Sequence, residues 1–127
     1  MDFNENKAIY LQIVEYVCEQ ILLSQWLPGN KIISIRDLAV AMEVNPNTVQ
    51  RAYDFLQQKE MITNKRGVGY FVDENALEKV LAFRKEQFIE NELGLFFRNM
   101  YLLNISTEEI KARYEKFIEQ NFKDKIS

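Results

Sequence analysis

The sequence lacks histidine entirely and has one cysteine, Cys18, and two prolines among its 127 residues. Histidine is the commonest general base and the commonest metal ligand in proteins, so its absence argues against acid–base catalysis and against a metal site. A single cysteine excludes a disulfide within the chain, which is typical of proteins that stay in a reducing compartment. We therefore expect a cytoplasmic protein in which Cys18 is a small buried apolar residue.

Long apolar runs and catalytic constellations are missing as well. No run approaches the roughly 20 residues that cross a bilayer, and the first residues lack a signal-peptide pattern, so no membrane partner is expected. The chain shows no cysteine dyad, no phosphate-binding loop after a strand and no cluster of metal ligands. The pair Glu108–Glu109 is better explained as negative charge at a helix N-terminus. We predict that the protein is not an enzyme and needs no cofactor.

Basic charge is also in short supply. The chain has 16 Lys and Arg against 19 Asp and Glu, and its pI is about 5.1. Nucleic-acid-binding proteins are usually basic, so the net negative charge argues against a protein of this class. Residues 45–70, however, contain four basic and two acidic residues. Because contacts depend on local charge, this segment remains compatible with a nucleic-acid site.

What the sequence does contain predicts a globular protein, with 47% hydrophobic and 28% charged residues. Its length suits one compact domain with an appendage. The first helical pattern covers residues 8–25, with apolar positions three or four residues apart. Leu27-Pro28-Gly29 is expected to end that helix, and Lys31-Ile32-Ile33 is a short β-prone piece.

Two capped helices follow at close spacing. Ser34 is a candidate N-cap for a short helix that ends near Met42. Asn45 is a second N-cap candidate, and Pro46 suits the first position of the next helix because its missing N–H has no partner there. A short helix, a tight turn and a second helix with a polar N-terminus are typical of a helix-turn-helix.

A β-hairpin completes this domain. Residues 61–64 and 69–72 read as two short strands, joined by the basic, glycine-containing loop 65–68. We predict a mainly α fold with a small β-hairpin (α+β). Its parts are a winged helix-turn-helix DNA-binding domain over 1–75 and a two-helix tail over 76–127 for dimerisation and effector response.

The tail is apolar over a broad face. Leu81, Phe88, Leu95 and Leu102 recur every seven residues in a helix expected to be about 28 residues long. A capping box over 106–109 opens a last helix, whose Ile110, Tyr114, Phe117, Ile118 and Phe122 are expected to face inward. The simpler interpretation is an intramolecular core, but two helices cannot cover so wide a stripe. We therefore predict a homodimer, with Phe88, Leu95, Phe96 and Met100 at its interface.

The motifs of residues 1–75 together resemble the GntR family of bacterial transcription regulators, and the tail resembles the family's short YtrA-type branch. The segments that carry the resemblance are Ile9-Tyr10-Leu11-Gln12-Ile13, Leu27-Pro28-Gly29, Ser34-Ile35-Arg36-Asp37-Leu38-Ala39, Val44-Asn45-Pro46-Asn47-Thr48-Val49, Ala52-Tyr53, Leu56 and Gly67-Val68-Gly69-Tyr70-Phe71-Val72. The resemblance implies a sequence-specific repressor that binds double-stranded DNA as a dimer, in this branch often at transporter operons. A small-molecule effector is compatible with it, but no residue identifies one.

The chain departs from the family pattern at three places. Ile32-Ile33 replaces the usual Leu-Pro before Ser34, and Asn45-Pro46 replaces the Ser-Arg of many relatives. Glu60 stands where a glycine is common, so a non-glycine residue must end the recognition helix and a carboxylate comes near the DNA. Because Asn45-Pro46 replaces Ser-Arg, one basic contact of many relatives is absent here.

The predicted DNA contacts gather at the helix-turn-helix and at the hairpin tip. The resemblance maps Arg36, Asn47, Thr48 and Gly67 onto family contact positions and Gln50 onto a frequent arginine position. Gln and Asn pair with adenine, and Arg pairs with guanine. The complete set is Ser34, Arg36, Asn47, Thr48, Gln50, Arg51, Lys65, Arg66 and Gly67.

The basic residues of this set also have a structural interpretation. Arg36 can pair with Asp37 or Glu43, Arg51 can pair with Asp54, and the basic hairpin tip can simply be solvated. Tyr10 and Tyr53 are expected in the core. An alternative function also stays open, namely a winged-helix protein-interaction module without DNA binding. DNA binding that weakens steeply with salt would separate the two.

Overall fold

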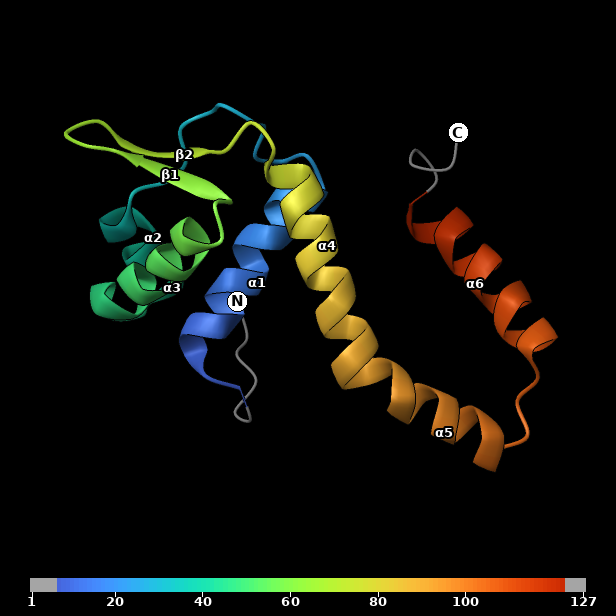
Figure 1. The fold of residues 1–127 in the computed structure, drawn as a ribbon. Helices are drawn as coiled ribbons and strands as arrows, with labels where there is room; N and C mark the ends of the chain where they lie inside the picture. The colour runs from blue at the N-terminus through green and yellow to red at the C-terminus, as the bar shows by residue number, and fades with distance from the viewer. Residues whose placement is uncertain (1–6, 123–127) are drawn as a thin grey trace. The chain divides into compact units, whose positions relative to one another are not determined.

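The computed structural model describes residues 7–122 and divides into two compact units after Lys85 (Figure 1). The division lies beyond the boundary at residues 75 and 76 that the sequence indicated, because Ala76 and Val80 are buried in the core of the first unit. The elements are α1 (Ile9–Leu22), α2 (Ile35–Met42), α3 (Pro46–Gln58), β1 (Ile62–Lys65), β2 (Gly69–Val72), α4 (Ala76–Phe88), the π-helical segment η1 (Ile89–Leu93), α5 (Gly94–Leu102) and α6 (Thr107–Asn121). The predicted mainly helical fold with one hairpin is confirmed.

The first helix ends earlier than the sequence suggested. It stops at Leu22, and Ser24 adopts a left-handed conformation with φ of 59°. The amides of Gln25 and Trp26 both donate to the carbonyl of Gln20, at 2.8 and 3.1 Å. These bonds satisfy a carbonyl that the helix end leaves open, so this turn ends α1 before Pro28 is reached.

One hydrophobic core joins α1, α2, α3, the hairpin and the first turns of α4. The predictions for Cys18 and Tyr53 are confirmed, since both side chains are fully buried. The Tyr53 hydroxyl donates a 2.8 Å hydrogen bond to the carbonyl of Ile33, which supplies its polar group with a partner. The buried apolar residues are Ile13, Val14, Val17, Cys18, Ile21, Ile32, Leu38, Ala39, Val49, Ala52, Tyr53, Leu56, Met61, Ile62, Val72, Ala76 and Val80.

Burial in this core predicts a loss of stability in alkaline solution. Burial raises the pKa of the Cys18 thiol from 9.0 to about 12, and it also raises the pKa of the Tyr53 hydroxyl. The unfolded chain therefore releases these protons at lower pH than the folded chain. We expect the free energy of unfolding to fall as pH rises above about 9, where the unfolded thiol begins to ionise.

Urea denaturation between pH 8 and pH 11 measures this effect, with Cys18→Ala and Tyr53→Phe as variants. In each variant, the free energy of unfolding should decrease less steeply with pH than in the wild type, whatever its value at pH 8. A fall as steep as that of the wild type in both variants would assign the effect to other groups.

The hairpin is attached to the rest of the first unit by a third extended segment. β1 and β2 pair antiparallel, with Ile62 opposite Val72 and Lys65 opposite Gly69. Lys31 forms a bridge to Phe71, and the amide of Ile32 donates to the backbone carbonyl of Tyr70 at 2.9 Å. The β-prone piece at Lys31 is thus a single bridge rather than a strand, and it attaches β2 to the segment that follows α1.

The predicted long helix is interrupted. Helical backbone continues from α4 through η1 into α5, but the five residues of η1 form a π-helix. Such segments are a recognised cause of helix bending. Gly94, at the start of α5, has an ordinary helical φ of −60°, and a Cβ there would meet nothing within 4 Å. A close helix–helix approach at Gly94 is therefore not found among the described residues.

In the second unit, no side chain of residues 86–122 is buried. Ser106 caps α6 as predicted, accepting a 3.0 Å hydrogen bond from the amide of Glu109. The inward orientation expected for α6 is wrong within the chain, since Tyr114 is 63% and Phe117 54% exposed. A helix lacking a packing partner leaves its apolar face in water. None of the helices described over 7–122 has the length and apolarity to cross a membrane.

Candidate nucleic-acid interface

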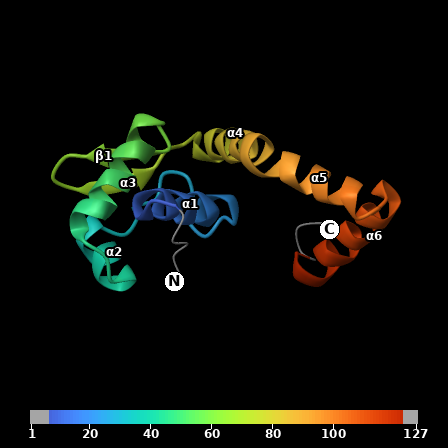
Figure 2. The same cartoon turned by 90° about the horizontal axis from the view of Figure 1, so that it is seen from below.

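The helix-turn-helix consists of α2, a tight turn and α3, which pack against each other and beside the hairpin (Figures 1 and 2). Ser34 Oγ accepts from the amide of Asp37 at 3.0 Å, and Asn45 Oδ1 accepts from the amide of Asn47 at 2.8 Å. Glu43 closes α2 with φ of 57°. The structural roles predicted for Asn45 and Pro46 are confirmed, because one caps α3 and the other begins it.

The polar front of α3 is held in place by its buried face. Val49, Ala52, Tyr53 and Leu56 are fully buried, and they orient the helix on the core. The opposite side carries exposed Asn47, Gln50, Arg51 and Asp54, with Thr48 half-buried. The N-terminal turns of the helix are therefore available to a groove, as in other helix-turn-helix proteins.

Gln50 contacts side chains on its own helix and on the hairpin. Its Nε2 donates a 2.8 Å hydrogen bond to Asp54 Oδ1, and the same nitrogen lies 3.4 Å from the hydroxyl oxygen of Tyr70 on β2. Tyr70 in turn packs edge-on against Tyr53, with ring centroids 5.0 Å apart. Gln50 thus bridges the recognition helix and the hairpin.

Arg51 stacks on an aromatic ring. Its guanidinium carbon lies 3.8 Å from the centre of the Tyr10 ring, which belongs to α1, is half-buried and packs against the edge of the core. A cation–π contact of this kind is worth about 0.5–1 kcal/mol at exposed sites. The alternative pairing of Arg51 with Asp54 is not found in the described part of the chain, where Asp54 accepts a hydrogen bond from Gln50 instead.

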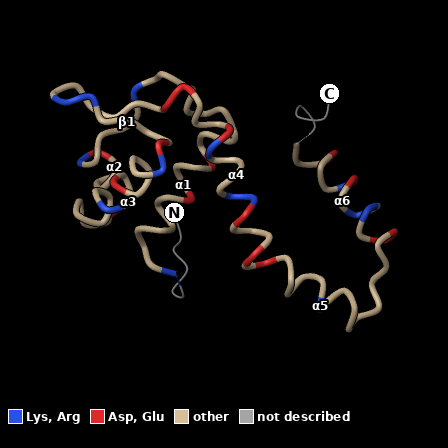
Figure 3. Tube along the Cα trace, viewed as in Figure 1, with Lys and Arg blue, Asp and Glu red and all other residues tan. Residues whose placement is uncertain are grey.

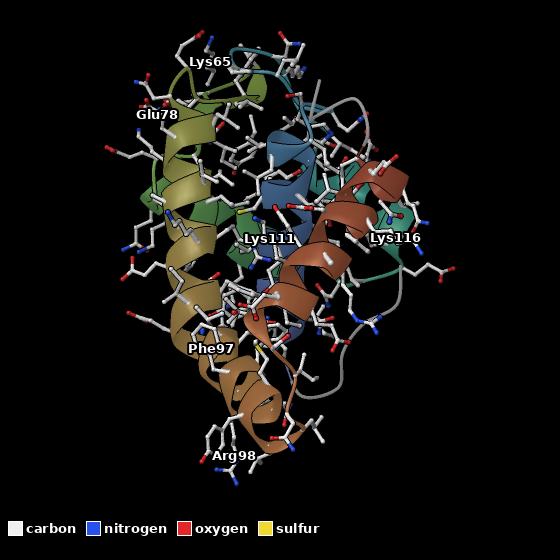
Figure 4. All side chains as sticks on the ribbon, turned by 90° about the vertical axis from the view of Figure 1, so that its right-hand side faces the viewer. Lys65, Glu78, Phe97, Arg98, Lys111 and Lys116 are labelled. Atoms are coloured by element: carbon white, nitrogen blue, oxygen red, sulfur yellow. The ribbon has the colours of Figure 1, made fainter. Side chains whose placement is uncertain are left out.

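The hairpin tip carries the basic loop. The amide of Val68 donates to the carbonyl of Lys65 at 2.8 Å, and Gly67 adopts φ of +77°, which favours glycine. Lys65 Nζ lies 4.2 Å from the centre of the Phe71 ring, and Arg66 is exposed. Figure 3 shows this tip as a basic segment at the end of the hairpin, and Figure 4 shows the Lys65 side chain there.

The sequence left open whether Arg36 forms an ion pair and how Glu60 ends the recognition helix. Arg36 is exposed in the first turn of α2, and no ion pair to Asp37 or Glu43 is found in the described part of the chain. Glu60 follows α3 with φ of 60°, so a non-glycine residue does hold the left-handed position. Lys79 Nζ lies 3.6 Å from the Glu60 carboxylate and 3.4 Å from that of Asp73, so one lysine partly offsets the negative charge that follows the C-terminus of α3.

No group of residues in 7–122 is arranged to hold a metal ion. An open polar cavity of about 330 Å³ lies beside Glu60 and Lys79. Its lining contains no aromatic side chain. The lining residues are Gln57, Glu60, Ile62, Thr63, Asp73, Asn75 and Lys79.

Tyr10, Asp54 and Tyr70 are parts of this surface that were not predicted from the sequence. The spacing of Gln50 and Asp54 by four residues in a helix was a usable signal, since such pairs are neighbours. Tyr70 lies 20 residues from Gln50, and Tyr10 lies further still from Arg51. No local pattern links residues so far apart in the chain.

These features define a winged helix-turn-helix protein with a polar recognition helix and a basic wing. The profile described as "Bacterial regulatory proteins, gntR family" matches residues 9–72, about half of the chain, and the chain belongs to that family. The chain is 32% identical to the HTH-type transcriptional regulator YhcF of Bacillus subtilis over 117 residues, covering 92% of this chain and 95% of YhcF.

Two further relatives cover the tail as well as the DNA-binding domain. The HTH-type transcriptional repressor YtrA of Bacillus subtilis is 31% identical over 110 residues, covering 87% of this chain and 84% of YtrA. A solved GntR-family regulator of Bacteroides thetaiotaomicron is 47% identical, with a TM-score of 0.70, over 89% of this chain and 98% of its own. The predicted relationship to GntR regulators of the YtrA type is confirmed.

Family membership establishes the general function. The chain is a DNA-binding transcriptional regulator, and its relatives are regulators rather than enzymes. The partner of such a protein is double-stranded DNA, so the alternative of a winged helix used only for protein binding is not favoured.

Proposed function

We propose that the protein is a homodimeric, cytoplasmic repressor that binds a two-fold operator. By analogy with the YtrA-type branch, we propose that this operator belongs to a transporter operon. The relative YtrA is a transcriptional repressor, which supports the sign of regulation. A two-fold dimer presents two recognition helices to paired half-sites, so protein symmetry and operator symmetry correspond. A small-molecule effector is compatible with the proposal, but none is identified.

The proposed DNA-facing surface joins the N-terminal turns of α2 and α3 to the hairpin tip. Arg36 and Lys65 would meet phosphates, which supply most of the affinity. Asn47, Thr48, Gln50 and Arg51 would reach base edges in the major groove, and Arg66 would enter the neighbouring minor groove. Gly67 allows the tight turn at the hairpin tip, and Ser34 would hold the start of α2 close to the DNA backbone.

The observation that carries the dimer is the exposed apolar surface of the second unit. Its largest exposed apolar side chains are Phe88, Ile89, Leu95, Phe96, Phe97, Tyr101, Leu102, Leu103, Tyr114, Phe117 and Phe122. Figure 4 shows Phe97 and Arg98 on α5, next to each other in the chain. So much exposed apolar surface marks an interaction site, and Phe88, Leu95, Phe96 and Met100 are the proposed interface residues.

The direct test is a selection of genomic DNA fragments by the purified protein at 50 mM and 200 mM salt. We expect an enriched motif with two-fold symmetry, bound more weakly at the higher salt because bound phosphates release counterions. The position of the motif would identify the regulated genes. A single unpaired half-site would contradict the dimer, and no enrichment at either salt would contradict operator binding by the protein alone.

A further inference from the structure

The hydrogen bonds of Gln50 restrict what it can offer to a DNA base. A carboxylate only accepts hydrogen bonds, so the Gln50 atom that faces Asp54 at 2.8 Å must be the amide nitrogen. That nitrogen has two N–H groups, and its second oxygen neighbour is the Tyr70 hydroxyl, at 3.4 Å. Both donors of the amide are therefore directed at oxygens of the same chain.

The carbonyl oxygen Oε1 is left as the free polar atom of the side chain. Within residues 7–122 it has no hydrogen-bond partner, and Gln50 is exposed on the second turn of α3. An acceptor alone cannot form the two-bond pair of glutamine with adenine, which also needs an N–H donated to N7. Of the two hydrogen bonds with adenine expected from the sequence, Gln50 can therefore form only the one that it accepts from N6.

We propose that Gln50 selects bases that carry an amino group in the major groove, adenine or cytosine, over guanine and thymine. Adenine N6 and cytosine N4 donate there, whereas guanine O6 and thymine O4 only accept and would face the glutamine oxygen without a hydrogen. Asp54 and Tyr70 act as positioning residues, because they hold the amide in this orientation. The inference rests on the proposed operator binding and specifies the base chemistry read at one position of each half-site.

The test compares operator selections by the full-length wild type, Gln50→Ala, Asp54→Ala and the matched control Gln58→Ala. Gln58 is also an exposed glutamine of α3, but it lies at the other end of the helix. In the wild type, one position per half-site should prefer A or C over G or T by roughly 3- to 10-fold, as one neutral hydrogen bond allows. Gln50→Ala should abolish this preference at that position alone, and Gln58→Ala should leave every position unchanged.

Asp54→Ala provides the sharper result. Freeing one N–H lets Gln50 donate to adenine N7 as well, so adenine should become preferred over cytosine by roughly 3- to 10-fold at the same position. A purely structural role of Asp54 would lower affinity without altering the ratio of adenine to cytosine. Tyr70→Phe, which removes the more distant oxygen, should move the ratio in the same direction but less.

The outcomes separate the two proposals. If the wild type selects no two-fold motif, operator binding fails and this inference fails with it. If a motif appears but Gln50→Ala changes none of its positions, only the inference about Gln50 is overturned. The same conclusion follows if the Gln50-dependent position prefers G or T, or if Asp54→Ala leaves the adenine-to-cytosine ratio as in the wild type.

Discussion

Replacing Leu95 with glutamate is expected to turn the proposed dimer into monomers. Leu95 is 64% exposed on α5, and a two-fold interface would bury the Leu95 side chains of both subunits. A carboxylate buried without a partner costs about 3–5 kcal/mol, and a two-fold interface contains two of them. Light scattering should therefore report half the mass of the wild type at the same concentration. Operator affinity should fall by about 10²- to 10⁴-fold, because the two half-sites are no longer bound by one linked particle.

Two comparison variants make this prediction specific. Leu95→Met keeps an apolar side chain of similar volume, so it should remain dimeric. Phe97→Glu introduces the same charge on the opposite side of α5, two residues further along the helix. An intact dimer in Leu95→Glu would show that the proposed interface face is wrong. Monomers in Phe97→Glu alone would transfer the interface to the side that carries Phe97.

Replacing Arg51 with alanine is expected to weaken binding to the selected operator by about 1–3 kcal/mol per half-site, and binding to random DNA by less. The stacking on Tyr10 uses the face of the guanidinium and leaves the N–H groups at its edge available. A planar donor group held in this way loses less conformational entropy when it pairs with guanine. The structure thus supports a reading role for Arg51 that the sequence could only suggest.

Titrations of both DNAs at one salt concentration measure this effect, with Arg51→Lys and Tyr10→Ala as further variants. Arg51→Lys keeps the charge but not the two-pronged donor geometry, so it should lose affinity mainly on the operator. Tyr10→Ala should weaken operator binding less than Arg51→Ala, because it removes only the stacking partner. Equal losses of affinity for both DNAs would show that Arg51 contacts a phosphate rather than a base. No loss would leave it as a surface residue that packs on α1.

The sequence by itself determined the parts of this protein that depend on neighbouring residues. Ser34, Asn45 and Ser106 cap helices where their patterns predicted, because a cap is made between residues only two or three apart in the chain. The same holds for the hairpin and its glycine turn, and together these motifs were sufficient to identify the family. Burial of Cys18 and Tyr53 followed from their positions on the apolar faces of helices.

Only the tertiary structure decided which side chains of the recognition helix are restrained. Arg51 meets Tyr10 of α1, and Gln50 meets Tyr70 of β2, through packing of elements far apart in the sequence. Helical spacing predicts which face of α3 is exposed, but it does not identify the residue that another element brings to that face. The π-helix at η1 and the exposed face of α6 were likewise not predicted, because an apolar pattern identifies a surface to be covered without identifying its partner.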